Sequence, residues 1–336
     1  MTLLTVHVLV AALLAAAPAK PLVAQPTYTN PVYPHDFPDP FILGYRGRFY
    51  AYATQSRGFG FQVMESPDLV HWEHKGTALQ VPWSKQHYWA PEVISYRGQF
   101  YMTYSALNPA TQKHDIGIAT AQSPLGPFQH KAILVGGPTN QVSTIDATIF
   151  IDRDGVPYLV YSEENPRRIV LRRMARDLMS VEEPVTELLR PDRPWERGVT
   201  EAPTLIRRNG LYHLFFSVGW YQSNKQDASY AVCHAVARSV KGPYVKDPEP
   251  LLKTVPGKVY GPGHQCVLKL PSGEWWMAYH AWDDVSEPRY GSNPSGRTLR
   301  IDRLRWEGDT PVVDGPTTIP QPAPRVGSGK GAAPAG

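Results

Sequence analysis

The amino-acid sequence predicts an all-β fold, and specifically a five-bladed β-propeller. Five segments carry this prediction, because each has a polar turn with one glycine followed by a run of aromatic and aliphatic residues. A glycine turn leading into such a run is typical of a β-hairpin. The amphipathic 3.6-residue period that marks a helix is nearly absent. The five turns contain Gly47, Gly98, Gly155, Gly210 and Gly273.

The spacing of these hairpins favours a propeller over a β-sandwich. Successive turn glycines are 51 to 63 residues apart, whereas the turns of a sandwich recur about every 8–12 residues. Long repeats with several short strands are the pattern of propeller blades. We therefore expect five blades, with the strand before each hairpin innermost. The hairpins read YRGRFYAYAT, YRGQFYMTYS, DRDGVPYLVYS, RRNGLYHLFFS and LPSGEWWMAYH, from residues 45, 96, 152, 207 and 270.

The two ends of the chain are predicted to lie outside the propeller, which we place at residues 25–315. Residues 1–24 contain an apolar run too short to span a bilayer and have the pattern of a signal peptide, with cleavage after Ala19 or Ala24. The Pro-, Gly- and Ala-rich segment 316–336 is predicted to be a disordered tail. The protein is therefore expected to be secreted or periplasmic, with no membrane-spanning segment.

Composition limits the classes of partner. The 336 residues include 34 Lys and Arg against 30 Asp and Glu. These charges are spread along the chain, so nothing predicts a nucleic-acid-binding surface, and we expect a monomer. The two cysteines, Cys233 and Cys266, match no zinc or redox spacing. They are either a disulfide or two buried free thiols, and their spacing leaves both possibilities open.

Each predicted inner strand carries one ionisable residue in an apolar or Pro/Gly-rich setting. In the first, Pro38 and Pro40 restrict the backbone around Asp39. An unpaired charge is costly to bury, so several such residues near one axis indicate a functional site. Crowded carboxylates shift one another's pKa, which provides a protonated acid and an ionised base together. The five residues are Asp39, Glu92, Asp146, Glu201 and His264.

Such a pair of carboxyl groups is what glycoside hydrolysis requires. One carboxylic acid protonates the leaving oxygen, while one carboxylate activates a water molecule or attacks directly. Two tryptophans near the inner-strand motifs, Trp89 and Trp220, are candidates for stacking on a sugar ring, and a place in the apolar core is the alternative for each. The pattern therefore indicates a carbohydrate as the partner.

Residues 28–315 resemble glycoside hydrolase family 43. The motifs that carry the resemblance are DFPDPF, YWAPEV, TIDATIFID, VTEAPTLIRRNGLYHLFFS, GPGH and GRTLRIDRLRW, in this order along the chain. The resemblance implies a five-bladed propeller in which Asp39 is the general base and Glu201 is the general acid. Asp146 would tune pKa values and orient the substrate. The residues expected to contact substrate are Trp89, Glu92, Trp220, His264 and Arg297.

The resemblance further implies an inverting enzyme that acts on α-L-arabinofuranosyl or β-D-xylosyl linkages of plant polysaccharides or oligosaccharides. The chemistry would need no cofactor. A structural calcium ion is expected near the propeller axis beside His264, held largely through water because Ca²⁺ prefers oxygen ligands. The sequence departs from the family pattern at Ala147 and Ala202, where Pro and Gly are common. Both residues are small, so the neighbouring acids should keep their positions.

Two other functions fit parts of the pattern. A non-catalytic propeller that binds carbohydrate or protein would keep the aromatic residues but would not need three acids. A hydrolase of the same architecture acting on another sugar, such as a fructosidase or galactosidase, would be expected to show a different acid motif in the first blade. The sequence leaves open the sugar, the linkage, and whether cleavage is exo or endo.

Overall fold

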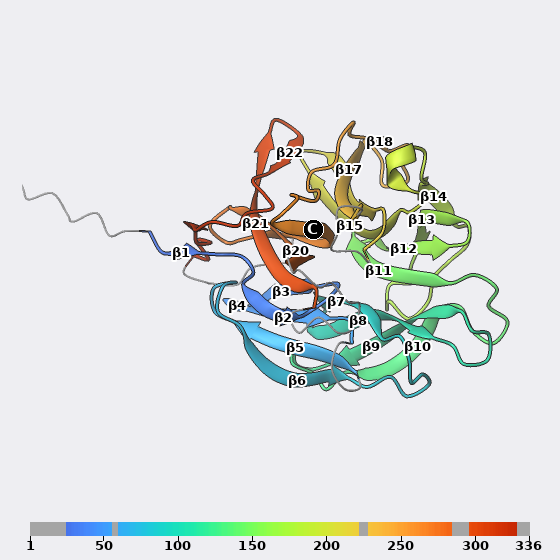
Figure 1. Ribbon diagram of the computed structural model, residues 1–336. Helices are drawn as coiled ribbons and strands as arrows, with labels where there is room; N and C mark the ends of the chain where they lie inside the picture. The colour runs from blue at the N-terminus through green and yellow to red at the C-terminus, as the bar shows by residue number, and fades with distance from the viewer. Residues whose placement is uncertain (1–24, 56–59, 222–227, 284–295, 328–336) are drawn as a thin grey trace, which may run out of the picture.

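The computed structural model describes residues 25–55, 60–221, 228–283 and 296–327, which form a five-bladed β-propeller (Figure 1). The innermost strands of the five sheets contact one another in a ring. Each precedes one of the predicted hairpin glycines, so the predicted fold is confirmed. The predicted signal peptide, residues 1–24, lies outside the described residues. The inner strands are β3 (Phe41–Tyr45), β7 (Trp89–Tyr96), β11 (Thr144–Ile151), β15 (Glu201–Arg208) and β19 (Val259–Lys269).

In the first four blades, three further strands follow the inner strand outward. They are β4 (Arg48–Ala53), β5 (Phe61–Ser66) and β6 (Glu73–Leu79); β8 (Gln99–Leu107), β9 (His114–Ala121) and β10 (Gln129–Val135); β12 (Pro157–Glu164), β13 (Arg167–Arg173) and β14 (Thr186–Leu189); β16 (Leu211–Val218), β17 (Ala231–Ala237) and β18 (Val245–Lys246). A short 3₁₀ helix, η1 (Pro194–Glu196), precedes the fourth blade. No helix within the described ranges is long and apolar enough to cross a membrane.

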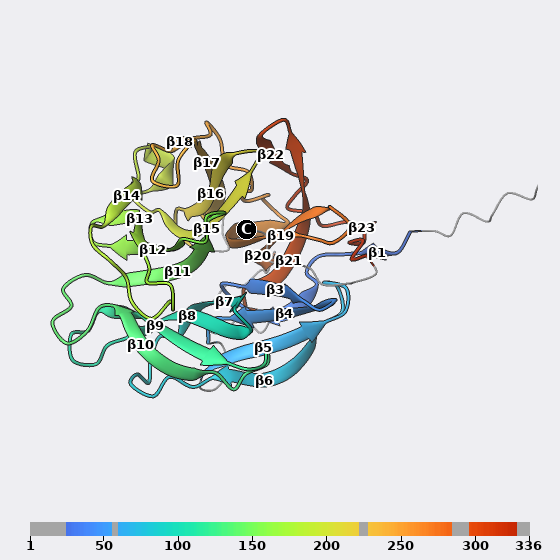
Figure 2. The ribbon, with the colours of Figure 1, turned by 180° about the vertical axis from the view of Figure 1, so that it is seen from behind.

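The fifth blade joins the two ends of the chain and thereby closes the ring. Its order is β19, β20 (Trp275–Asp283), β21 (Thr298–Glu307) and the early strand β2 (Tyr33–Asp36), with β22 (Thr310–Val313) also paired to β21. Figure 2 shows a second contact of this kind, in which β1 (Thr27–Tyr28) lies beside β23 (Gln321–Pro322). Closure therefore depends on hydrogen bonds between segments at opposite ends of the sequence.

The chain beyond residue 315 differs from the disordered tail that the sequence predicts. β23 lies within it, and Ala323 and Val326 pack against the apolar cluster shared by the first and fifth blades. Arg325 donates to the buried carboxylate of Glu274 at 2.6 Å. The folded unit therefore extends to residue 327, because specific partners order a segment whose composition alone predicts disorder. Residues 328–336 lie outside the described part of the chain.

The apolar core is divided among the interfaces between blades. Five clusters of buried side chains each join two adjacent blades. Cys233 belongs to the cluster between the third and fourth blades, and Cys266 to the cluster between the fifth and first. Both thiols are buried and free. The structure thus selects free thiols over the disulfide that the sequence left open.

A left-handed backbone turn recurs at the axis end of each blade. One non-glycine residue there has φ between 45 and 57°, a conformation that is unfavourable for residues with a Cβ atom. In β7, β11, β15 and β19 this residue lies at a register shift with the second strand. Such a bulge re-aims the side chains around it. The five residues are Asp39, Ala90, Asp146, Ala202 and His264.

Four of these residues donate their backbone N–H to a side chain of the preceding blade. The acceptor lies at or near the end of that blade's second strand and is the last residue of a hairpin motif. The pairs are Thr54 Oγ1 with Ala90 (2.8 Å), Ser105 Oγ with Asp146 (3.2 Å), Ser217 Oγ with His264 (2.8 Å) and His280 Nδ1 with Asp39 (3.0 Å). We call these contacts latches. They connect the inner strands to one another in addition to apolar packing.

The junction between the third and fourth blades is different. Ser162 is the equivalent residue, because it pairs with Ile145 as Ser105 pairs with Trp89. Its buried hydroxyl has no hydrogen-bond partner among the described residues. The Ala202 N–H instead donates to Asp146 Oδ2 at 3.0 Å. A predicted catalytic carboxylate therefore takes the structural role that a hydroxyl or imidazole has at the other junctions.

Replacing a latch acceptor should destabilise the protein. Ser105→Ala leaves the buried Asp146 N–H unpaired and should lower the free energy of unfolding by about 1–3 kcal/mol. Ser162→Ala is the matched control and should cost much less, because its hydroxyl has no partner to lose. Urea unfolding followed by tryptophan fluorescence measures both. Equal losses in the two variants would contradict the latch.

Candidate active site

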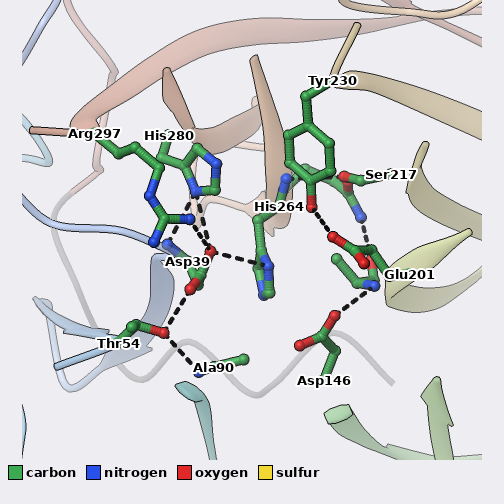
Figure 3. A network of polar contacts seen from close by, with 12 residues as sticks. Asp39, Thr54, Ala90, Asp146, Glu201, Ser217, Tyr230, His264, His280 and Arg297 are labelled. Atoms are coloured by element: carbon green, nitrogen blue, oxygen red, sulfur yellow. Dashed lines mark hydrogen bonds and ion pairs between the residues drawn. The ribbon is translucent and has the colours of Figure 1, made fainter. Parts of the chain in front are cut away.

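The structure brings together the three acids that the sequence predicts to be catalytic (Figure 3). Asp39 lies two residues before β3, Asp146 lies in β11, and Glu201 begins β15. Burial is the largest cause of the raised pKa of Asp146, and the charges of Glu201 and Asp39 raise it further. Three blades thus direct carboxyl groups into one electrostatically connected cluster at the propeller axis.

Asp39 is held as a carboxylate. Arg297 Nη1 donates to Oδ1 at 2.9 Å, and the Thr54 hydroxyl donates to Oδ2 at 2.5 Å. Nδ1 of His264 lies 3.3 Å from Oδ1. Burial alone would raise the pKa of Asp39, but the Arg297 guanidinium, together with His264 and His280, outweighs burial and holds the pKa well below its usual range.

His280 fixes the backbone of Asp39. Its Nδ1 accepts the Asp39 N–H at 3.0 Å, so the ring proton lies on the other nitrogen. Burial, with a contribution from Arg297, lowers the pKa of His280 to about 3, and the ring is neutral at ordinary pH. The ring also stacks on Tyr230, with the two ring centroids 5.6 Å apart and the ring planes at 9°. His280 therefore links the Asp39 side of the site to the Glu201 side.

Glu201 is in a different electrostatic environment. The Tyr230 hydroxyl donates to Oε1 at 2.8 Å, and Arg167 Nη1 lies 3.5 Å from Oε2. Burial raises the pKa of Glu201 to about 7; Tyr230 and Arg167 oppose the rise, and Asp39 adds to it. A carboxyl group with a pKa near neutrality can donate a proton at neutral pH and take it back, as a general acid must.

Asp146 couples these two acids to the fold. Burial, followed by the charges of Glu201 and Asp39, raises its pKa well above the ordinary value, and the hydrogen bond from the Ala202 N–H partly opposes this. Because Asp146 and Glu201 repel each other when both are ionised, protonation of one favours ionisation of the other. The charge of Glu201 thus helps to keep Asp146 protonated, and Asp146 also braces the next inner strand.

Glu201 differs from the other two acids by one residue in its position relative to the left-handed turn. Asp39 and Asp146 are themselves left-handed residues, whereas Glu201 precedes the left-handed Ala202. Trp89 precedes Ala90 in the same way, so Trp89 and Glu201 occupy equivalent positions. The φ of 53° at Ala202 also explains why glycine is common there in the family that the sequence resembles.

The two predicted tryptophans differ in exposure. Trp89 is partly buried and stacks on His87 and His114, with ring centroids 4.8 and 4.2 Å away. Trp220 is 43% exposed, and the guanidinium carbon of Arg167 lies 5.5 Å from its ring centroid. Trp220 is therefore available at the surface, and Arg167 connects it to Glu201.

Glu92 lies apart from the three acids in its interactions. Burial raises its pKa to about 8, and a hydrogen bond with Thr148 partly opposes the rise. Burial, with a smaller contribution from the charge of Glu92, raises the pKa of Cys266. Glu92 is therefore protonated at neutral pH, and its predicted contact with substrate stays a prediction.

The residues around His264 do not form a side-chain metal site. Nδ1 of His264 faces the Asp39 carboxylate, and burial lowers the pKa of the ring. Within the described ranges, no group of three or more His, Cys, Asp or Glu side chains is arranged to hold a metal ion. The donors present do not fit calcium held directly by side chains, and the water-held ion stays a prediction.

Sequence reasoning missed four residues of this site. His280 and Thr54 end two of the hairpin motifs, and comparing the last positions of all five would have singled out His280, which stands where the others have Ser or Thr. Tyr230 and Arg167 lie outside the motifs, and no sequence pattern marks them. Their roles depend on contacts between blades.

Comparison with known proteins supports the fold. A model of the family described as "Glycosyl hydrolases family 43" matches residues 28–311. A crystal structure of a thermostable family-43 glycoside hydrolase is 37% identical with a TM-score of 0.80, and the match covers 89% of this chain and 99% of that chain. The β-D-galactofuranosidase xynD of Aspergillus niger is 28% identical over 75% of each chain. The extracellular endo-α-(1→5)-L-arabinanase 1 of Bacillus subtilis is 25% identical over 62% of this chain and 67% of that protein.

Removing the Arg297 cation should raise the pKa of Asp39. In Arg297→Gln, the largest contribution that lowers this pKa is lost, so the Asp39 carboxyl should titrate at a higher pH than in the wild type. NMR of ¹³C-labelled carboxyl groups follows this titration, and Asp39→Asn identifies the signal. Arg303→Gln is the control, because Arg303 lies in β21, which begins directly after Arg297, but pairs with Glu274. An unchanged Asp39 titration in Arg297→Gln would contradict the assignment.

Proposed function

Since the chain belongs to glycoside hydrolase family 43, we propose that it is an inverting glycosidase that releases α-L-arabinofuranosyl residues from plant polysaccharides or oligosaccharides. β-D-Xylosyl linkages are the second candidate. The predicted signal peptide supports secretion or export to the periplasm, and we propose that the enzyme works as a monomer. The chemistry requires no cofactor, and a calcium ion near the axis would be structural.

The observation that carries the proposal is the opposite protonation preference of Asp39 and Glu201. Arg297 holds Asp39 ionised, while burial brings the pKa of Glu201 to about 7. Two carboxyl groups in one site with separated pKa values are the requirement for paired acid and base catalysis. A propeller that only binds carbohydrate or protein has no need for this separation, which disfavours the non-catalytic alternative.

The proposed reaction is a single displacement. The Asp39 carboxylate accepts a proton from a water molecule as the water oxygen bonds to the anomeric carbon. The bond from that carbon to the glycosidic oxygen breaks, and the departing oxygen takes the proton of Glu201. Proton exchange with solvent then restores both groups. The donors Arg297 and Thr54 orient the Asp39 carboxylate, and the charge of Asp39 favours the protonated form of Glu201.

The choice of sugar rests on the chemistry of the named relatives. One relative is a β-D-galactofuranosidase and another an α-L-arabinanase. The α-L-arabinofuranosyl ring has the configuration of the β-D-galactofuranosyl ring and lacks only its terminal hydroxymethyl group. A pocket that accepts a five-membered ring of this configuration is therefore compatible with both names. Aryl α-L-arabinofuranoside, β-D-xyloside and β-D-galactofuranoside, with arabinan and xylan, form the panel that tests the substrate.

Changing each acid should give a different kinetic signature. Asp39→Asn should nearly abolish turnover of every substrate, because no base activates the water. Glu201→Gln should slow substrates with poor leaving groups far more than activated aryl glycosides, since only the former need the proton.

Steady-state kinetics on the panel measures both effects, and thermal unfolding shows whether each variant is folded. Wild-type rates from folded Asp39→Asn would refute the base assignment. The lack of any activity of the wild-type enzyme on the whole panel would refute the proposed substrate class.

A further inference from the structure

We propose that Arg167 and Trp220 form the subsite for the leaving-group sugar, and that Arg167 also sets the upper pH limit of activity through Glu201. The inference rests on the proposed function. It assigns the part of the substrate on the far side of the cleaved bond to two residues of this chain, and it makes both residues determinants of specificity for oligosaccharides over simple glycosides.

The two residues form a continuous path from the general acid to solvent. The side chains of Glu201 and Arg167 are 13% and 26% exposed, and Trp220 is 43% exposed. Arg167 contacts both of the others, at 3.5 Å from Glu201 Oε2 and 5.5 Å from the Trp220 ring centroid. Arg167 and the indole ring of Trp220 therefore connect the buried Glu201 carboxyl group to the protein surface.

The position of both residues is set by the junction of the third and fourth blades. Arg167 begins β13, and Trp220 follows β16. The Trp220 N–H donates to Ser229 Oγ at 3.1 Å, which fixes the backbone below the exposed ring. This is the same junction at which Asp146 accepts the Ala202 N–H.

The geometry of Glu201 favours the Arg167 side for the leaving group. Oε1 already accepts the Tyr230 hydroxyl, and the buried Tyr230 and His280 rings fill that side. Oε2 faces Arg167 at 3.5 Å, the outer limit for a hydrogen bond, so this contact is easily exchanged. The glycosidic oxygen must approach the general acid to receive its proton. The sugar that leaves with this oxygen then lies beside Arg167.

The chemistry of the pair fits a sugar ring. A guanidinium has several N–H donors that hydrogen-bond to sugar hydroxyl oxygens, and it stacks on aromatic faces. The exposed indole offers an apolar face to the C–H groups of the ring. Neither residue is needed for an aryl glycoside, whose leaving group has no hydroxyls to bind and needs no proton.

Arg167 also acts on the general acid through its charge. It lowers the pKa of Glu201, which burial raises to about 7. Glu201 works in its protonated form, so the rate is lost as the pH rises through its pKa. Removing the cation should raise this pKa. The alkaline limb of the pH–rate profile for an oligosaccharide, whose leaving group needs the proton, should then move to higher pH.

The test compares Arg167→Met and Trp220→Ala with the wild type on a matched pair of substrates. One is an aryl glycoside and the other is an oligosaccharide of the same sugar. For the oligosaccharide, kcat/KM should fall by about tenfold or more in Arg167→Met, mostly through KM, because a hydrogen bond from a charged donor is lost. The fall for the aryl glycoside should be much smaller, and Trp220→Phe should recover part of the loss seen in Trp220→Ala.

Arg168→Met is the control, since the neighbouring Arg168 pairs with Glu163 and Glu187 instead. It should leave both the substrate ratio and the alkaline limb unchanged. Equal losses on the two substrates in Arg167→Met, or an unmoved alkaline limb, would overturn the subsite while leaving the glycosidase intact. A wild-type protein inactive on both substrates would instead overturn the proposed function.

Discussion

The site depends on a backbone constraint that recurs at the axis end of every blade. Five residues other than glycine adopt a left-handed conformation there, and the hydrogen bonds of their N–H groups stabilise it. At Asp39 and Asp146 the constrained residue is itself an acid, and at Ala202 it follows one. The contacts that hold the blades together therefore also aim the carboxyl groups. A change in a latch is expected to act on stability and on the site together.

Electrostatics then divides the roles among groups of the same chemical type. Asp39 and Glu201 are both largely buried, and burial disfavours the ionised form of each. The cations differ, because Arg297 donates to Asp39 at 2.9 Å, whereas Arg167 lies 3.5 Å from Glu201. His264 and His280 also lower the pKa of Asp39. No arginine is among the main causes that shift the pKa of Asp146, and its carboxyl group instead accepts a hydrogen bond from the Ala202 N–H. The distance and bonding of the cations thus separate a base from an acid.

Much of this arrangement follows from the sequence, and the limits have physical causes. Turn glycines and aromatic runs predict the hairpins, and their period predicts the blades, because these signals are local. Asp39, Asp146 and Glu201 stand out as acids in apolar surroundings. Asp146 and Glu201 lie the same number of residues before their turn glycines. This count does not show that Asp146 is itself the left-handed residue of its bulge, whereas Glu201 precedes the left-handed Ala202. Tyr230 and Arg167 reach the site only through the packing of different blades. The ordered segment 316–327 depends on partners that its composition does not show.

In the proposed mechanism, Asp39 activates water on one face of the sugar while Glu201 protonates the leaving oxygen. This pairing gives a single displacement and therefore inverts the anomeric carbon. ¹H NMR of the first sugar released, recorded before mutarotation, measures the outcome directly. We expect an initial product whose anomeric configuration is opposite to that of the substrate. An initial product that keeps the substrate's configuration would contradict the roles assigned to both residues.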